Sequence, residues 1–173
     1  MSILVIDLET TGLPEKNGYR FYSPTQLEKY ENARITQFRY VMYDKPNPLI
    51  IGEGKFDVLP DNLVDLLDRT KCIVMHSVNI NMRILLSELY RANMLTEYNK
   101  MLDISTSCIM RTYQMCFGVN EKCAAIPRMC DSLRVCHQSD RRLYYCALEI
   151  EQLIANTRHN FAIIQVKVEK ITN

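Results

Sequence analysis

The chain has 173 residues and a mass of 20.2 kDa, which is the size of one ordinary domain. Hydrophobic residues make up 47% and charged residues 24%, values that exclude a disordered, collagen-like or coiled-coil chain. The 21 Lys and Arg residues are balanced by 20 Asp and Glu residues, so the composition lacks the strong positive charge of many nucleic-acid-binding proteins. We therefore expect one packed domain. The composition alone does not identify the kind of partner that it binds.

The sequence predicts strands where short apolar runs or alternating patterns are bounded by turn residues. These strands cover residues 3–6, 34–43, 49–58, 72–75 and 161–171. Pro46 and Pro48 punctuate the connection between the second and third strands, which predicts a hairpin. Residues 16–32 are polar and follow no clear period, so we expect a long loop with one helical turn.

Helices are predicted where apolar residues recur every three or four positions. They cover residues 61–68, 80–92, 107–116, 124–133 and 141–154. This order of elements predicts an α/β protein with a mixed sheet of about five strands flanked by helices, plus an extra C-terminal strand. The first strand is expected at the centre of the sheet, and chemistry is expected at the carboxyl ends of its buried strands.

No stretch reaches the roughly 20 apolar residues that span a bilayer, and the start of the chain lacks a charged leader and a cleavage site. The seven cysteines are an odd number without a repeated spacing, which favours free thiols in a reducing compartment. We therefore expect an intracellular protein, cytoplasmic or nuclear, without a membrane partner.

Three cysteines and a histidine lie near one another in the sequence, at Cys123, Cys130, Cys136 and His137. A zinc site is one interpretation, but structural zinc ligands usually lie two to four residues apart, and these cysteines are more widely spaced. Buried free thiols are the interpretation that we favour.

Asp7 and Glu9 directly follow the first predicted strand. Their spacing lets both carboxylates point to one side of the sheet and share a hard divalent cation such as Mg²⁺. Carboxylates at strand ends are more often structural or solvated, so this spacing alone is weak evidence for a metal site.

The segment Asp-Leu-Glu-Thr-Thr-Gly at 7–12 resembles the first motif of the DEDDh-type 3′-to-5′ exonucleases, which have a ribonuclease-H-like fold. Residues 34–38, 74–81 and 137–142 are similar to further segments of that family. The resemblance covers about residues 2–157. It implies an exonuclease-like domain over 1–157, with 158–173 as a C-terminal strand extension of the same domain.

In that family, two metal ions held by four acidic residues activate a water, and a histidine of the third motif acts as general base. The resemblance therefore implies Asp7 and Glu9 as ligands of Mg²⁺ or Mn²⁺ and His137 as the base. Asn81 and Arg142 stand where the other two carboxylates belong.

These two departures weaken the inherited metal site. Asn81 keeps a carbonyl oxygen as a ligand, but Arg142 cannot bind a cation and would repel a metal or occupy its place. Asp140 is a substitute ligand if the loop after His137 is reshaped; on a helix, it would face away from Arg142's position.

The resemblance also implies a nucleic-acid-binding set of Thr10, Thr11, Leu13, His76 and Arg142. Thr10, Thr11 and Leu13 would contact the terminal nucleotide, although turn formation around the following glycine explains them equally simply. His76 follows the fourth predicted strand, where a hydrogen-bonded structural role is the simpler interpretation.

Three hypotheses follow. The chain is an active, metal-dependent 3′-to-5′ exonuclease on single-stranded DNA or RNA ends; or an inactive relative that binds single-stranded nucleic acid, with Arg142 on a phosphate. The third is an interaction protein whose C-terminal strand pairs with a protein partner or a second copy. The charge distribution favours a nucleic-acid partner, because residues 100–142 contain seven basic and four acidic residues.

Overall fold

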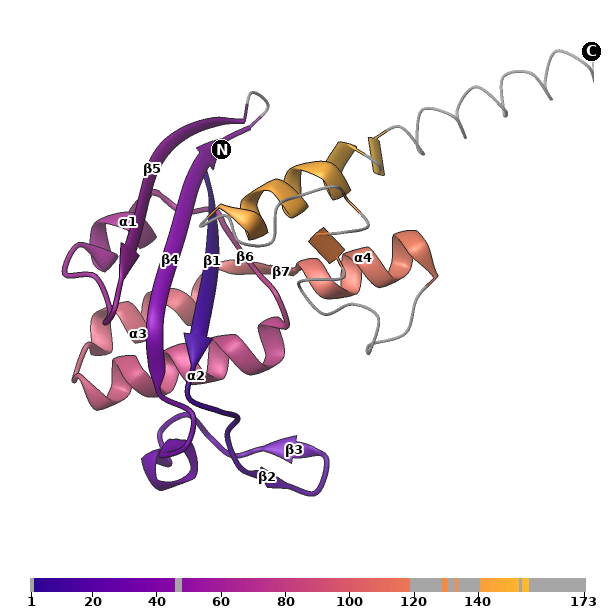
Figure 1. Ribbon diagram of the computed structural model, residues 1–173. Helices are drawn as coiled ribbons and strands as arrows, with labels where there is room; N and C mark the ends of the chain where they lie inside the picture. Colours follow the sequence, from indigo (N-terminus) through magenta and orange to yellow (C-terminus); the bar gives the residue numbers. More distant parts are fainter. Residues whose placement is uncertain are drawn as a thin grey trace, which may run out of the picture.

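The computed structural model describes residues 2–45, 48–118, 129–130, 133, 141–152 and 154–155. Its centre is a mixed five-stranded sheet of order β5-β4-β1-β6-β7 (Figure 1). The strands are β1 (Ser2–Thr10), β4 (Ile35–Asp44), β5 (Leu49–Phe56), β6 (Cys72–Met75) and β7 (Ser105–Cys108). β4 runs antiparallel to both β1 and β5, whereas β6 runs parallel to β1 and β7. The predicted architecture, with the first strand central and a β4–β5 hairpin, is confirmed.

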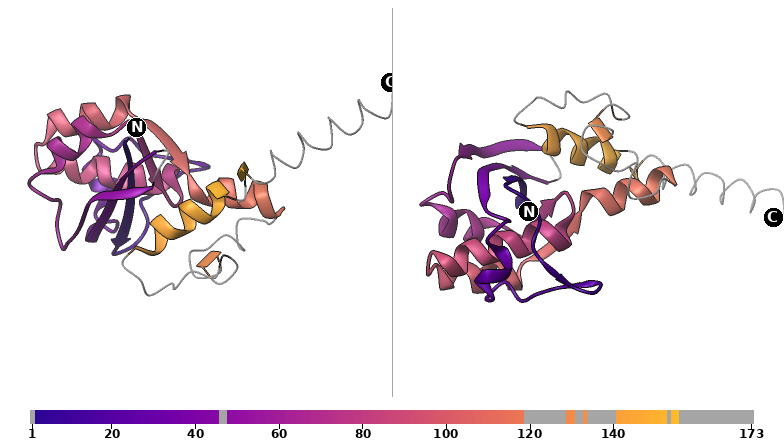
Figure 2. Two further views of the ribbon diagram at one scale, coloured as in Figure 1. Left: turned by 90° about the horizontal axis from the view of Figure 1, so that it is seen from above. Right: turned by 60° about the horizontal axis from the view of Figure 1, so that its bottom comes forward.

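Helices cover both faces of this sheet (Figures 1 and 2). On one face lie α1 (Leu63–Arg69), α2 (Val78–Arg91) and α3 (Leu95–Asp103). On the other face lie α4 (Ile109–Phe117) and the helix formed by residues 142–152. Because both faces are covered, β1 is apolar on both sides until it reaches its acidic end.

The alternation of side chains along β1 divides the core in two. Leu4 and Ile6 point toward α1, α2 and α3, and each is completely buried. Ile3 and Val5 point the other way and pack against residues of α4 and the 142–152 helix, including Tyr113. The same alternation continues to the end of β1 and decides which layer its acidic residues face.

The segment between β1 and β4 contains a small hairpin and a helical turn. The hairpin pairs β2 (Lys16–Asn17) with β3 (Arg20–Phe21), and the turn is the 3₁₀ helix η1 (Leu27–Tyr30). The helical turn was predicted, whereas the hairpin was not. In Figure 1 the hairpin projects beyond the end of the sheet at which β1 finishes.

Two further elements were not predicted. β7 is short and polar, and its pairing with β6 forms the strand. It also takes the first two residues of the helix predicted over 107–116, which begins instead at Ile109 as α4. α3 was missed although Leu95, Tyr98 and Met101 recur at helical spacing.

Some expectations fall largely outside the described residues. Of the helix predicted over 124–133, only residues 129–130 and 133 are described, and the strand predicted over 161–171 is not described at all. Among the described helices, none is long and apolar enough to cross a membrane.

The cysteine cluster is described only at Cys130. Its Sγ lies 3.6 Å from that of Cys146, and both residues are completely buried in the core. This position agrees with the favoured interpretation of a buried free thiol. The other members of the suggested zinc cluster, Cys123, Cys136 and His137, lie outside the described residues.

Candidate functional site

The alternation of β1 places Asp7 and Glu9 on the same face as Ile3 and Val5, the face that the 142–152 helix covers. The Asp7 carboxylate is buried, with a side chain only 7% exposed. Glu9 lies one pleat farther toward the end of the strand and its side chain is 45% exposed. A buried carboxylate requires a cation or hydrogen-bond donors, so the partners of Asp7 determine what this site can do.

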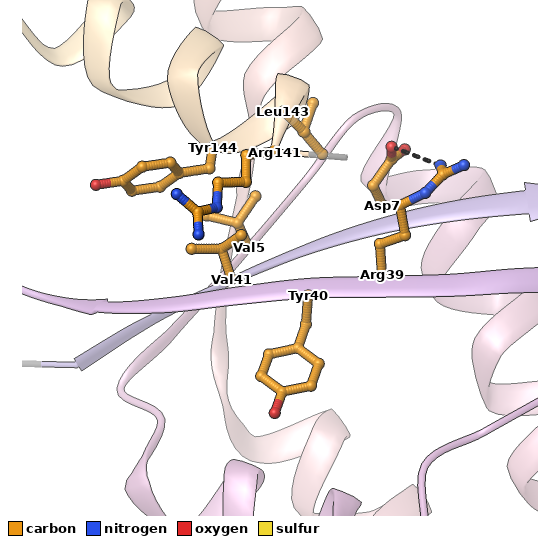
Figure 3. Close-up of a pocket in the computed structure, with 8 residues that line it drawn as sticks. All are labelled: Val5, Asp7, Arg39, Tyr40, Val41, Arg141, Leu143 and Tyr144. Carbon is orange, nitrogen blue, oxygen red and sulfur yellow. Dashed lines mark hydrogen bonds and ion pairs between the residues drawn. The ribbon is translucent and has the colours of Figure 1, made fainter. Parts of the chain in front are cut away.

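Arg39 is the first partner of both carboxylates. It lies directly opposite Asp7 in the β1–β4 pairing and points to the same face. Its Nη1 lies 3.4 Å from Asp7 Oδ2, and its Nη2 donates to Glu9 Oε1 at 2.6 Å. Figure 3 shows Arg39 and Asp7 on one side of β4, with Tyr40 on the opposite side.

Arg142 is the second partner and approaches from the other layer. It is the first residue of the 142–152 helix. Its Nε donates to Asp7 Oδ2 at 2.9 Å, and its Nη2 lies 3.7 Å from Glu9 Oε1. The two arginines therefore hold the same two carboxylates from the sheet and from the helix.

The start of the 142–152 helix is fixed by further contacts with the β4–β5 hairpin. Arg141 makes a double hydrogen bond to Glu53 of β5, at 2.5 and 2.6 Å. The Tyr144 hydroxyl donates to the Pro48 carbonyl at 3.0 Å. Arg141, Tyr144 and Val5 also line the small pocket drawn in Figure 3, next to the Asp7 side chain. These contacts hold Arg142 over β1.

The electrostatics of the cluster follow from its composition. Two carboxylates and two guanidinium groups give it a formal charge of zero, because arginine stays protonated in proteins. The hydrogen bond from Arg39 lowers the pKa of Glu9 against the opposing effect of burial, and the positive charges of Arg39, Arg142 and Lys55 lower it further. Glu9 therefore remains ionised at neutral pH, as part of a closed set of ion pairs.

Asn81 lies at the first turn of α2 and is used as a structural donor. Its Nδ2 donates to the main-chain oxygen of His76 at 2.5 Å. His76 is the residue that follows β6, so this bond ties the end of the strand to the start of the helix. Between them, Ser77 adopts a left-handed backbone with φ of 50°. The structure thus gives Asn81 a role in the connection between β6 and α2.

Thr10 and Thr11 both make hydrogen bonds that hold the chain after β1. Thr10 Oγ1 donates to the Gly12 carbonyl at 3.0 Å. Thr11 Oγ1 donates to the Asn32 carbonyl at 3.0 Å and accepts from the Arg34 amide at 2.9 Å. These bonds support the turn-forming interpretation of the threonines.

Leu13 and His76 differ in exposure. The Leu13 side chain is 65% exposed at the end of the sheet near Glu9, where it is available to a ligand. His76 is partly buried at the end of β6. The predicted base His137 and the substitute ligand Asp140 lie outside the described residues.

The described residues do not fit the two-metal site that the family resemblance implies. Arg39 and Arg142 approach Asp7 and Glu9 where a cation would bind. Within the described part of the chain, no three His, Cys, Asp or Glu side chains are grouped closely enough to hold a metal ion. A divalent cation would have to displace the guanidinium groups from the carboxylates before binding.

Sequence reasoning missed Arg39, although a signal was present. On β4 the residues facing the 142–152 helix are Arg39, Val41 and Tyr43, of which the last two are apolar core residues. A charged residue in line with two core residues indicates a buried counter-ion. The carboxylates of β1 were the obvious candidates for that counter-ion.

No protein-family model matches the sequence, and no curated protein is a significant match. Solved structures do match. A product-bound structure of exonuclease I has a TM-score of 0.61 and 14% identity, over 90% of this chain and 43% of that one. A structure titled as 3′-end-specific recognition of histone mRNA stem-loop by a 3′-exonuclease has a TM-score of 0.53 and 14% identity, over 92% of this chain and 82% of that one.

Complexes with nucleic acid are among the matches. E. coli exonuclease I bound to a dT13 oligonucleotide has a TM-score of 0.58 and 14% identity, covering 95% of this chain and 43% of the exonuclease. A zinc-bound complex of the same enzyme with single-stranded DNA scores 0.60 at 16% identity, covering 90% of this chain and 40% of that one. The chain spans about two fifths of the exonuclease I structures that it matches. At the level of the fold the resemblance to DEDDh-type exonucleases is confirmed: the chain has their ribonuclease-H-like α/β fold.

Proposed function

We propose that this chain binds the 3′ end of single-stranded nucleic acid without hydrolysing it. The observation that carries the proposal is the double ion pair of Arg39 and Arg142 with Asp7 and Glu9. The resemblance to the exonucleases implies that these two carboxylates would hold metal ions. Here they are neutralised by the chain's own side chains.

The ion pairs oppose metal binding in two ways. Each guanidinium uses carboxylate oxygens that a metal would need, and Asp7 is too buried to be left without a partner during exchange. A cation entering beside Arg39 and Arg142 would also be repelled by both. Two-metal hydrolysis therefore has no support from the described ligand set.

The ion pairs that oppose metal binding also make the site compatible with phosphate. Four carboxylates without metal would repel a phosphodiester, whereas the present cluster is formally neutral. Lys55 lies opposite Arg39 on β5, so a further basic residue lies beside the cluster. Guanidinium groups bind phosphate oxygens well. Arg142 is the residue we propose for this contact, because its side chain is 21% exposed while its Nε pairs with Asp7.

The test combines binding with digestion. A fluorescein-labelled oligothymidylate is titrated with the full chain in EDTA, and the same oligonucleotide is incubated with the chain in Mg²⁺ or Mn²⁺. We expect binding in EDTA and no shortening in either metal. Arg142→Glu should weaken binding at least tenfold, whereas Lys71→Glu should not, because Lys71 lies at the opposite end of the sheet beside Ser2.

Two outcomes overturn the proposal. Metal-dependent shortening that Asp7→Ala abolishes would establish the chain as an active exonuclease. Absence of both binding and digestion would leave the interaction hypothesis, in which the C-terminal strand pairs with a protein partner or a second copy of the chain.

A further inference from the structure

The β2–β3 hairpin carries side chains that the site just described does not use. The hairpin and its base combine the aromatic residues Tyr19, Phe21 and Tyr22 with the basic residues Lys16 and Arg20. Alternation of aromatic and basic side chains is the pattern of surfaces that bind single-stranded nucleic acid, because rings stack on bases and cations contact phosphates.

The turn of this hairpin determines how Tyr19 is presented. Asn17 pairs with Arg20, so the loop between them consists of Gly18 and Tyr19 alone. Gly18 has φ of 61°, the conformation that tight two-residue hairpin turns require at their first central position. Tyr19 therefore occupies the tip, and its side chain is fully exposed, at 103%.

The Tyr19 ring buries no surface against the rest of the described fold, because it is fully exposed. Within the described part of the chain, Tyr19 makes no ring contact and Arg20 no ion pair. By contrast, the neighbouring Lys16 lies over the Phe21 ring at 4.6 Å, which keeps its ammonium group beside an aromatic face. The tip is thus available to a ligand that offers both a π-face and negative charge.

The base of the hairpin is rigid although its tip is exposed. The Tyr22 carbonyl accepts from the buried Tyr30 hydroxyl at 2.7 Å and from Arg83 of α2 at 3.3 Å. The Glu15 amide donates to the Lys29 carbonyl at 3.0 Å. The two ends of the hairpin are therefore anchored, and the tip has a defined position, which lowers the entropic cost of binding.

The hairpin also lies at the correct end of the molecule. It projects from the end of the sheet where β1 carries Asp7 and Glu9 (Figure 1). Lys16 lies seven positions after Glu9, so the two are at most about 25 Å apart. A single strand whose 3′ end lies at Asp7 and Glu9 can cover this distance with its upstream nucleotides.

We infer that the β2–β3 hairpin is a second contact surface for single-stranded nucleic acid, with Tyr19 stacking on a base and Arg20 contacting the backbone upstream of the 3′ end. This inference rests on the proposed function, because it takes the strand's end to lie at Asp7 and Glu9. It adds a length requirement: strands that reach the hairpin bind more tightly than strands that contact only the site.

The test compares short and long oligonucleotides in EDTA by fluorescence anisotropy. Oligothymidylates of about 4 and about 16 nucleotides are titrated with the wild-type chain, Tyr19→Ala and Tyr19→Phe. We expect Tyr19→Ala to weaken binding of the long strand about tenfold and to leave the short strand nearly unchanged. Tyr19→Phe keeps the ring and should bind the long strand as the wild type does.

Arg20→Gln provides a separate readout through salt. Removing one phosphate contact should lower the slope of log affinity against log salt by about 0.7 for the long strand only. Tyr90→Ala and Lys71→Gln are the matched controls: Tyr90 lies on α2 against Tyr98, and Lys71 at the far end of the sheet. Neither control should change binding, and thermal melting should confirm that all variants are folded.

The outcomes separate this inference from the proposed function. If the wild-type chain binds both oligonucleotides and the Tyr19 and Arg20 variants bind them equally well, the hairpin has no such role and the 3′-end site stands. If the wild-type chain binds neither oligonucleotide, both proposals fail.

Discussion

Arg142 and Asp7 are 135 positions apart in the sequence, yet Nε of the arginine lies 2.9 Å from Oδ2 of the aspartate. The contact joins the helix of residues 142–152 to the central strand of the sheet. Arg39 completes it from β4, so Asp7 receives positive charge from two separate elements. The meeting point of strand and helix is thus occupied by a set of ion pairs between two carboxylates and two guanidinium groups.

Introducing acidic residues at the candidate site should create a metal site. The triple variant Arg39→Gln, Asn81→Asp, Arg142→Asp removes both guanidinium groups and leaves four carboxylates on β1, α2 and the 142–152 helix. We expect calorimetry to detect Mn²⁺ binding to this variant at concentrations where the wild-type chain takes up none, because carboxylate number and net charge set the affinity.

Arg142→Gln alone is the control for this experiment, since it removes a charge without supplying a ligand. It should gain much less Mn²⁺ affinity than the triple variant. Equal Mn²⁺ binding by the wild-type chain and the triple variant would mean that the ion pairs with Arg39 and Arg142 do not block the site.

Much of the fold follows from the sequence because its strands have clear local patterns. The apolar run of β1 and the alternation of β4 predict a buried central strand and a hairpin, and both are present. β7 escapes prediction because its polar sequence becomes a strand only through pairing with β6. The β2–β3 hairpin is only two residues long on each side, but Gly18, at the first position of its two-residue loop, was a usable turn signal.

The sequence indicated the two carboxylates and Arg142 of the candidate site, but it did not indicate Arg39. Asp7 and Glu9 follow from a local motif, and Arg142 from alignment with a family pattern. The role of Arg39 depends on the register between β1 and β4, which places it directly opposite Asp7. A single sequence indicates that a charged residue lies on the buried face of β4. Only the register of β4 against β1 identifies its partner.

Arg39→Met should destabilise the chain. The substitution removes a nearly buried guanidinium and leaves buried Asp7 with Arg142 as its remaining described cation. We expect the free energy of unfolding in urea to fall by about 2–3 kcal/mol. Lys55→Met, at the exposed position opposite Arg39 on β5, should change it by less than about 0.5 kcal/mol.

A double variant separates charge from packing. If Asp7→Asn is combined with Arg39→Met, the buried carboxylate is removed together with the buried guanidinium, and Arg142 keeps Glu9 as a charged partner. We therefore expect part of the lost stability to return. Equal losses for the single and double variants would show that Arg39 acts through packing of its side chain and not through the ion pair.

The ion pairs of Glu9 should make stability depend on acid pH. The Arg39 hydrogen bond, followed by the charges of Arg39 and Arg142, lowers the pKa of Glu9 below its ordinary value of 4.5. A carboxyl whose pKa is depressed by folding stabilises the protein above its unfolded pKa, and this contribution is lost as the pH falls through the folded value. Stability attributable to Glu9 should therefore be complete above about pH 5.5 and decline below about pH 4.5.

Urea unfolding of the wild-type chain and Glu9→Gln at several pH values measures this contribution. The wild-type chain should be the more stable of the two at neutral pH, and the difference should shrink as the pH is lowered below 4.5. Glu28→Gln is the matched control, because Glu28 is an exposed carboxylate on η1. If the difference in unfolding free energy between the wild-type chain and Glu9→Gln stays constant down to pH 3, the Glu9 ion pair is not its cause, because an effect that does not involve the Glu9 charge does not depend on pH.

Gly12→Ala should disrupt the turn that follows β1. A Cβ added at Gly12 would lie 2.6 Å from the Asn32 carbonyl oxygen, which also accepts the hydrogen bond from Thr11 Oγ1. Because that oxygen belongs to the main chain, the clash can be relieved only by separating the two loops and weakening the Thr11 bond. We expect a loss of about 1–3 kcal/mol in the free energy of unfolding, measured in urea. Gly52→Ala is the matched control, because its Cβ would meet nothing closer than 3.8 Å, and its effect should stay within about 1 kcal/mol. Equal effects of the two substitutions would show that the approach of Gly12 to Asn32 does not constrain the fold.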